Sequence, residues 1–390
     1  MKKQSLFLFA LSLAVFGVIT TELAIIGLLP QVMNNFQIDV QQAGLLVSVY
    51  AIVVAISGPF ITLMMSGWNR KYVLMGILVL FVVSNLVYAL TQDYATMMTF
   101  RVLPALVHAV FFSVALVAAT SIVPVEEQSN AAAKVFAGVA IGLVFGIPVS
   151  AFLAEQYSLT YAFYFGLASC AVALVSVMFL MEDAPVEKKM SFGSQVNILR
   201  SKSMWLSLFT VVFLFSAMFS SYSFITQYLS VVTNMNGSWI SAMLMVFGVF
   251  GIFGNFIFGK LIGKSMKKTV IIYPIILSLI FVAIYLMGFS FYFMIAMIAF
   301  WGAVHSAGLI VSQTWVMDNA GDAKVFANSL YISFSNLGIT IGSVVAGWFI
   351  SKLGVENLFI SSLVFSVLAL VSVLLNQGKG ISLKVAEAKQ

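Results

Sequence analysis

Long apolar runs, separated by short polar segments, make up nearly the whole sequence. Because a helix needs about 20 apolar residues to cross a bilayer, each run predicts one membrane span. The first run follows two lysines, but it is longer than the roughly 7–15-residue apolar core of a secretory signal, so we expect an uncleaved span. The twelve predicted spans lie at 5–33, 42–66, 72–90, 95–123, 131–155, 160–181, 204–232, 238–262, 268–288, 291–317, 324–352 and 356–376.

The composition supports this interpretation. Of the 390 residues, 62% are hydrophobic and 8% are charged, whereas soluble domains have about 45–50% and about 25%. Such a chain is neither disordered nor a coiled coil, and we expect no nucleic-acid partner in spite of its net charge of +6. The single cysteine, Cys170, allows no intrachain disulfide and no Cys-x-x-Cys motif. The pattern predicts an all-α integral membrane protein without a cofactor or metal.

The basic residues indicate how the chain is oriented. With an even number of spans, both termini lie on one side of the membrane and the loops alternate. That side collects 17 of the 19 lysines and arginines, against Lys352 alone on the other side. Because cytoplasmic loops carry the excess of Lys and Arg, we expect a multi-pass protein of the inner (cytoplasmic) membrane with both termini in the cytoplasm.

One long polar segment near the midpoint separates six spans from six. We expect an N-terminal six-helix bundle at 1–181, a cytoplasmic linker at 182–203, a C-terminal six-helix bundle at 204–376 and a cytoplasmic tail at 377–390. Matched features recur between the halves: His108 and His305 lie 197 residues apart, and Gly142 and Gly146 precede Gly338 and Gly342 by 196. Duplicated six-span halves with a substrate site between them are typical of one class of secondary transporters.

Few ionisable residues lie inside the predicted spans, and each is a functional candidate because a charge in a bilayer is costly. Glu22 lies about 16 Å from the outer end of the first span, and a buried carboxylate there is suited to proton or substrate handling. The alternative is a structural pair with Arg101. We expect Arg101 either to tune the acid or to extend to the membrane interface. His108, seven residues beyond Arg101 on the same helical face, is a proton or substrate ligand or a packing residue.

Polar and aromatic groups in the second half are candidates for a substrate cavity, with hydrogen bonding between helices as the alternative for each. Span 7 carries many hydroxyls and ends in polar residues, and span 10 places a tryptophan and a glutamine on either side of a histidine. The candidates are Tyr222, Gln227, Trp301, His305, Gln313 and Asn336.

Small residues mark the fifth span. Gly138, Gly142 and Gly146 follow one another at steps of four and are followed by Pro148. Glycines at this spacing allow a close helix approach, and the proline weakens the local helix. We therefore expect a hinge at Gly142, Gly146 and Pro148, or else static tight packing.

Four stretches resemble the major facilitator superfamily: TTELAIIGLLPQV, RVLPALVHAVFFSVAL, GLVFGIPVSAF and FANSLYISFSNLGITIGSVVAGW. Along nearly its full length the chain is similar to the twelve-span drug and metabolite:proton antiporters, in the branch of sugar (arabinose) efflux permeases and purine nucleoside efflux pumps. The resemblance implies that Glu22 couples protons and contributes to substrate binding, that Arg101 modulates it, and that the glycine-proline segment is associated with export. Ser66 and Gly263 stand where the family's cytoplasmic motif carries an acid, and Ala105 stands where a glycine is common.

The expected function is export of a small solute, a sugar or related metabolite, in exchange for protons by alternating access. Multidrug or purine nucleoside export on the same scaffold is the alternative, and a proton-coupled importer is a further one. A polytopic enzyme would need a cluster of His, Asp and Glu that the sequence lacks, and nothing resembles the selectivity filter of a channel. We expect the partners to be protons, the small-molecule substrate and the lipid bilayer, and the protein to be a monomer.

Overall fold

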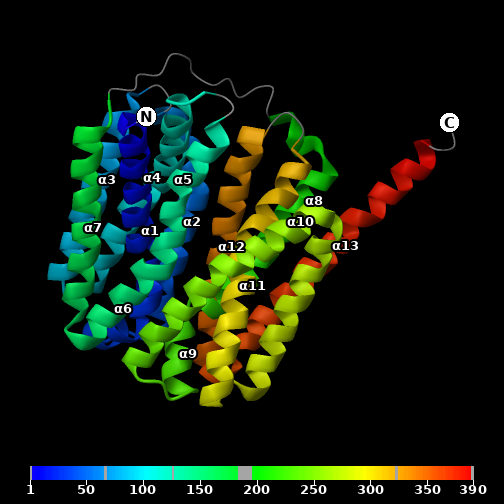
Figure 1. The fold of residues 1–390 in the computed structure, drawn as a ribbon. Coiled ribbons are helices and arrows are strands. Elements are labelled where there is room, and N and C mark those ends of the chain that lie inside the picture. Colours follow the sequence, from blue (N-terminus) through cyan, green and yellow to red (C-terminus); the bar gives the residue numbers. More distant parts are fainter. Residues whose placement is uncertain (1, 66–67, 125–126, 183–195, 321–323, 388–390) are drawn as a thin grey trace. The chain divides into compact units, whose positions relative to one another are not determined.

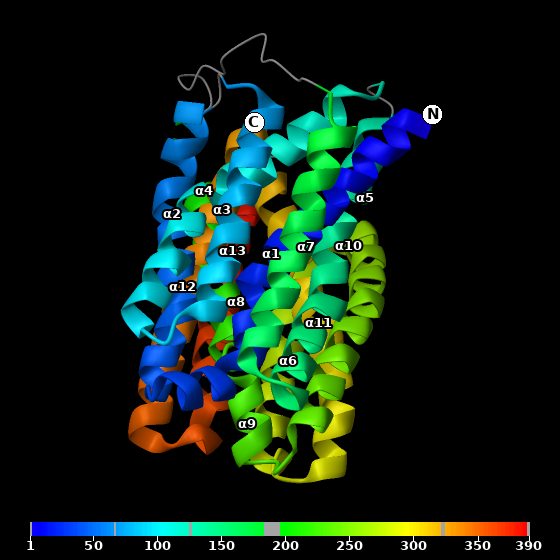
Figure 2. The same cartoon turned by 90° about the vertical axis from the view of Figure 1, so that its left-hand side faces the viewer.

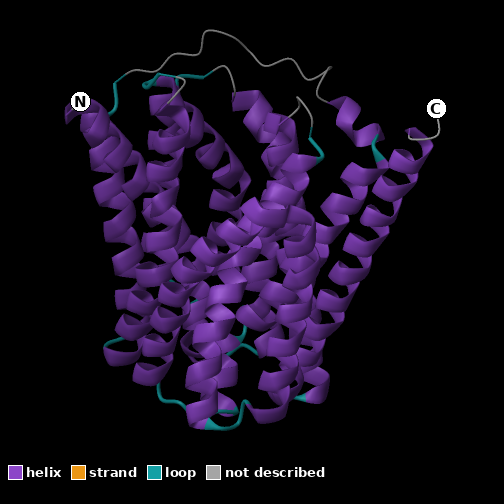
Figure 3. Cartoon of the chain, turned by 45° about the vertical axis from the view of Figure 1, so that its right-hand side comes forward, coloured by secondary structure: helices purple, strands orange, loops and turns teal. Residues whose placement is uncertain are grey.

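The computed structural model describes residues 2–65, 68–124, 127–182, 196–320 and 324–387. Helices and short connections make up these residues, and no strand occurs among them (Figure 3). Ser66 and most of the predicted linker lie outside the described residues. The elements, of which Figure 1 labels the α-helices, are α1 (Lys2–Phe36), α2 (Val40–Met65), α3 (Arg70–Leu90), α4 (Tyr94–Ser121), α5 (Gln128–Ile141), the π-helix η2 (Gly142–Gly146), α6 (Ile147–Gln156), α7 (Leu159–Leu180), η3 (Val196–Arg200), α8 (Lys202–Tyr222), α9 (Ile225–Val231), α10 (Gly237–Met287), α11 (Phe291–Asp318), α12 (Lys324–Leu353), η4 (Val355–Asn357) and α13 (Leu358–Glu387).

The helices agree with the predicted spans, although two spans are divided and two others are joined in one long helix. In the described residues, eleven helices are long and apolar enough to cross a membrane. One of them, α10, is 51 residues long, about twice what a bilayer needs. Its backbone leaves the helical region at Ser265, between predicted spans 8 and 9, so it supplies both. Span 5 is divided into α5, η2 and α6, and span 7 into α8 and α9.

The described chain forms two compact units. Residues 1–190, 225–230 and 235–248 form the first unit, and residues 191–224, 231–234 and 249–390 form the second. The change at 190/191 falls inside the segment that the sequence analysis assigns to a linker. The short helix α9 and the first turns of α10 belong to the first unit, although they follow α8 in sequence.

Glycines bring η2 and its neighbours close to α1 in the first unit. Helix α1 packs against α5, η2, α6 and α7, and its course beside α7 is seen in Figure 2. A side chain at Gly146 would collide with the Thr20 hydroxyl, and one at Gly142 would lie 2.7 Å from the Ile19 side chain. The close approach predicted for this span is therefore confirmed, and the π-helix begins and ends at its glycines.

The same contacts recur in the second unit, where α12 packs against α8. A Cβ atom at Gly342 would lie 2.5 Å from the backbone oxygen of Ser216. Gly146 and Thr20 precede this pair by 196 residues at both positions. The offset found in the sequence thus relates equivalent helix contacts in the two units.

Two prolines free backbone oxygens that tyrosine and threonine hydroxyls then satisfy. Proline has no N–H, so the carbonyl four residues before it loses its helical donor. Pro104 in α4 frees the oxygen of Phe100, and the Tyr88 hydroxyl donates to it at 2.8 Å. Pro30 in α1 frees the Ile26 oxygen in the same way.

The Thr226 hydroxyl of α9 donates to this Ile26 oxygen at 3.0 Å. Both hydroxyls remove an unsatisfied polar group that would be costly inside a membrane protein.

Buried serines in α8 and directly after its end hold the second unit together. Ser216 donates to the oxygen of Gly338, and Ser223 shares a 2.8 Å hydrogen bond with Ser343. Ser220 bonds to Ser361 in α13. Hydrogen bonding between helices, the alternative left open for these hydroxyls, is therefore their observed role in this structure.

Candidate functional site

Two helices of the first unit bring the predicted proton-handling residues together. Glu22 comes from α1 and His108 from α4, and the Glu22 Oε2 atom lies 3.6 Å from the His108 Nε2 atom. The exposed fractions of the two side chains are 12% and 8%, so the pair has little contact with solvent. A pair so buried can be neutralised by a proton on either partner.

His108 is fixed from its other side by Tyr50 of α2. The Tyr50 hydroxyl and His108 Nδ1 share a hydrogen bond of 2.9 Å, and the two rings meet edge to face at 5.6 Å. Phe112, one turn along α4, packs against the imidazole with a centroid distance of 4.8 Å. These contacts orient the imidazole so that its remaining nitrogen points at the carboxylate of Glu22.

Arg101 is buried. The residue is only 2% exposed, so the interpretation as a residue that extends to the membrane interface is wrong. It also bonds to backbone rather than to the Glu22 carboxylate: the NH2 group donates to the Glu22 oxygen at 2.7 Å and NH1 to the Thr21 oxygen at 3.0 Å. The Nε group donates to the Leu46 oxygen at 3.0 Å. Arg101 therefore joins α1 to α2 by way of α4.

The guanidinium of Arg101 also lies 4.5 Å from the centre of the Tyr50 ring. This is within the distance at which a cation is attracted to an aromatic face. Tyr50 thus contacts both His108 and Arg101, and it connects the acid pair to the arginine.

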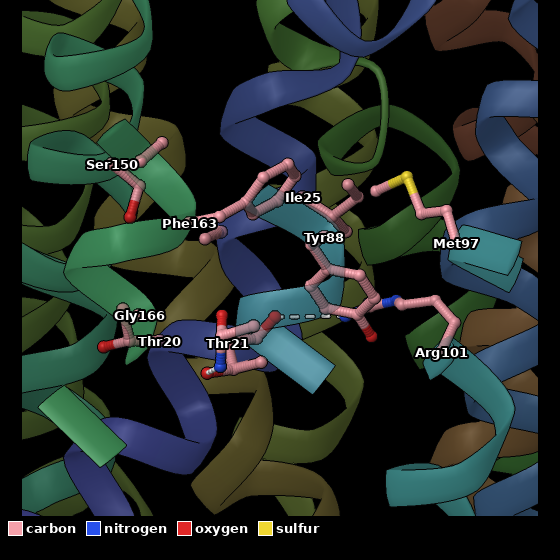
Figure 4. Close-up of a pocket in the computed structure, with 12 residues that line it drawn as sticks. Thr20, Thr21, Ile25, Tyr88, Met97, Arg101, Ser150, Phe163 and Gly166 are labelled. Atoms are coloured by element: carbon pink, nitrogen blue, oxygen red, sulfur yellow. Dashed lines mark hydrogen bonds between the residues drawn. The ribbon is translucent and has the colours of Figure 1, made fainter. Parts of the chain in front are cut away.

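A small cavity of about 10 Å³ lies on the α1 side of Arg101, close to the least volume that holds one water molecule. Figure 4 shows Arg101 reaching toward Thr21 across this cavity, with their hydrogen bond drawn as a dashed line. Thr20 and Ser150 also line it. The Thr20 hydroxyl is fully buried and has no hydrogen-bond partner among the described residues, so it is free to bond to a water here.

A second cluster of predicted residues lies in the second unit. The His305 ring of α11 lies 4.8 Å from Tyr222 of α8 and 6.2 Å from Trp301, one turn away. Phe219 packs against the same imidazole at 5.6 Å. The structure therefore brings Tyr222, Trp301 and His305 into one aromatic cluster.

The two histidines differ in what lies beside them. The Glu22 carboxylate lies beside His108, whereas the rings of Phe219 and Tyr222 lie beside His305. The acidic chemistry belongs to the first unit, and the aromatic surface belongs to the second.

The remaining predicted substrate ligands do not join this cluster. Gln313 is exposed, and its amide donates to Asn328 at 2.9 Å. Asn336 is buried and donates to the Ile332 oxygen of its own helix. Gln227 lies in α9, which belongs to the first unit. In the described part of the chain, no three His, Cys, Asp or Glu residues are grouped to hold a metal ion.

Sequence reasoning missed Tyr50. It is one of 13 tyrosines and lies in an apolar run without any motif. Its position opposite His108 depends on how α2 packs against α4, which no local pattern reveals.

The relatives of this chain among known proteins include transport proteins. The "Inner membrane transport protein YdhP" of Escherichia coli (strain K12) is 30% identical over 374 residues, covering 95% of this chain and 96% of the relative. A "Probable sugar efflux transporter" of Mannheimia succiniciproducens is 25% identical over 365 residues, covering 93% and 91%. These relatives are transport proteins, which confirms the prediction of a transporter and not an enzyme.

Solved structures share the fold. A bacterial homolog of the human lysosomal transporter Spinster, in an inward-facing and unoccupied conformation, has a TM-score of 0.76 at 15% identity, with 96% of this chain and 97% of that chain covered. The nucleoside transporter NupG (D323A mutant) has a TM-score of 0.74 at 14% identity, with 96% and 99% covered.

The family model of the Major Facilitator Superfamily matches residues 11–325 and 267–389, which together make up nearly the whole chain. The matched segments include the helices that carry Glu22, His108 and His305. The chain therefore belongs to the Major Facilitator Superfamily and is a multi-pass membrane transporter.

Proposed function

We propose that this transporter exports a small hydroxylated solute, a sugar or related metabolite, in exchange for protons. The observation that carries the proposal is the buried Glu22–His108 pair, which Tyr50 orients. An ionised carboxylate or imidazolium left alone inside a membrane protein is costly by several kcal/mol. Proton uptake or release at the Glu22–His108 pair therefore changes the free energy of a conformation in which the pair is buried.

Coupling follows if the pair is solvated differently in the two conformations of an alternating-access cycle. A proton can shift the equilibrium only by its differential affinity for the two states. In the proposed cycle, a proton that enters from outside neutralises the pair and favours the state open to the cytoplasm. The proton is then released to the cytoplasm, and the solute binds from the cytoplasm and is carried out.

The glycine segment at Gly142 and Gly146, followed by Pro148, is proposed as the place where the first half bends during this cycle. Its π-helical turn contacts α1, the helix that carries Glu22. Bending there would therefore alter the surroundings of the acid pair. The two six-helix bundles of the sequence analysis are the proposed moving parts.

The aromatic cluster of Tyr222, Trp301 and His305 is the proposed platform for the ring of the solute. Aromatic faces with a few polar groups are typical of small-molecule sites. The same faces suit a purine as well as a sugar, so nucleoside export is the second candidate. The name of the Mannheimia relative favours the sugar.

The test uses purified protein in liposomes with an acidic lumen and labelled arabinose, inosine or a cationic dye outside. An antiporter accumulates its solute in these liposomes as protons leave, whereas a symporter does not. We expect Glu22→Gln to abolish accumulation and to retain solute exchange without a proton gradient. The exposed Glu356→Gln variant is the matched control and should behave as wild type. Accumulation by Glu22→Gln at the wild-type rate would disprove the coupling role.

A further inference from the structure

A polar cavity of about 300 Å³ lies at the end of the first unit away from the N-terminus. Its lining comes from the last turns of α1, the end of α6, α9 and the start of α10, and all of these residues belong to the first unit. Its volume is at the lower end of the roughly 300–1,000 Å³ of small-molecule sites. Gln31 of α1 lies nine residues beyond Glu22, a rise of about 13 Å along the helix, so this cavity is separate from the acid pair.

The cavity is rich in hydrogen-bond acceptors and carries one acid. Glu155 of α6 contributes a carboxylate, and Gln31 donates to its Oε2 atom at 3.3 Å. The Gln31 Oε1 atom is buried and has no hydrogen-bond partner among the described residues.

Two hydroxyls in the lining already donate their hydrogen bonds to backbone oxygens. Thr226 donates to Ile26 at 3.0 Å, and Ser241 donates to Gly237 at 2.9 Å. Both oxygens keep lone pairs that can accept hydrogen bonds from a ligand.

No lysine, arginine or histidine is among the residues that line this cavity. The site therefore favours a ligand that donates hydrogen bonds and carries positive charge. We propose that it binds the ammonium group of a small protonated amine that also bears hydroxyls, with Glu155 as the counter-charge and Gln31 Oε1 as a second acceptor. This binding does not depend on the proposed proton coupling.

Gly237, the first residue of α10, makes room for the acid. A Cβ atom at this position would overlap the side chain of Glu155. A Gly237→Ala substitution would therefore displace the carboxylate while keeping its charge, which separates the geometry of the site from its electrostatics.

The experiment compares glucosamine, a protonated amino sugar, with glucose, which carries a hydroxyl in place of the amine. The thermal unfolding of purified protein in detergent is followed at pH 7 over a range of concentrations of each sugar, with chloride kept equal. Glu155 is exposed, so water weakens any ion pair that it forms with the amine. We therefore expect glucosamine to bind about threefold more tightly than glucose, and the preference to be lost in Glu155→Gln and reduced in Gly237→Ala.

Two further variants locate the site. Glu356→Gln, which changes an exposed acid outside the cavity, should keep the preference, and so should Glu22→Gln. Absence of the preference in the wild type would overturn the proposal, as would its survival in both Glu155→Gln and Gly237→Ala. Loss in Glu22→Gln with retention in Glu155→Gln would place the amine at the acid pair instead. The transport assay with Glu22→Gln is read separately, so either proposal can fail without the other.

Discussion

Replacing Arg101 with lysine tests whether this residue acts by its charge or by its geometry. The guanidinium donates to three backbone oxygens on two helices, those of Thr21 and Glu22 on α1 and of Leu46 on α2. A lysine keeps the positive charge, but its compact ammonium lacks the planar fork that reaches both helices. We expect the lysine variant to lose one or two of these three hydrogen bonds.

The expected size follows from the number of bonds lost. A hydrogen bond to a charged group contributes about 1.5–3 kcal/mol, while hydrogen bonds between membrane helices have measured values of about 0.6–1.7 kcal/mol. Loss of one or two bonds, together with the cation–π contact with Tyr50, therefore gives a decrease of about 2–4 kcal/mol in the free energy of unfolding.

The measurement is equilibrium unfolding in mixed micelles with increasing sodium dodecyl sulfate. Arg200→Lys makes the same chemical change at an exposed position and should stay within about 0.5 kcal/mol of wild type. If Arg101→Lys is equally stable, the three backbone bonds do not hold α1 and α2 together and the geometric argument is refuted. Retained proton coupling in a destabilised Arg101→Lys variant would show that charge serves transport and geometry serves the fold.

Three further outcomes are expected. Gly342→Ala should destabilise the protein by about 1–3 kcal/mol, because the close contact between α12 and α8 leaves no space for a methyl group, whereas Gly76→Ala, with open space around it, should be neutral or stabilising in the same unfolding assay. Tyr88→Phe should lower the free energy of unfolding by about 1–2 kcal/mol, since it leaves a proline-freed carbonyl unpaired, and an unchanged value relative to the exposed Tyr72→Phe would contradict this. Asp93 caps the start of α4, where its carboxylate accepts hydrogen bonds from the backbone N–H and the hydroxyl of Thr96, and these bonds lower the pKa of Asp93 below its ordinary value of 3.8. Asp93→Ala should therefore lower the melting temperature by its full amount above about pH 4, and by progressively less as the pH falls through the lowered pKa of the carboxylate. A decrease in melting temperature that does not change with pH would be inconsistent with this cap.

The sequence by itself determined the fold class, the number of spans and the residues with buried charge. Hydropathy was sufficient for these because a bilayer demands long apolar helices, and because each charged residue inside one stands out. The duplicated halves were also visible, since the glycines that pack against α1 and α8 recur at one offset. The expected structural partner of the Glu22 side chain was Arg101, and the structure places His108 beside the carboxylate instead.

Only the tertiary structure decided the partners of these residues. Arg101 bonds to backbone oxygens, Tyr50 orients His108, and Glu155 meets Gln31 in a cavity that no motif marks. Each of these contacts joins residues far apart in sequence, and each depends on the rotation and depth of two packed helices. Periodicity indicates which face of a helix is apolar. It does not indicate which other helix packs against that face or in what register, because the packing of all neighbouring helices together decides this. The chemistry of the site depends on that packing.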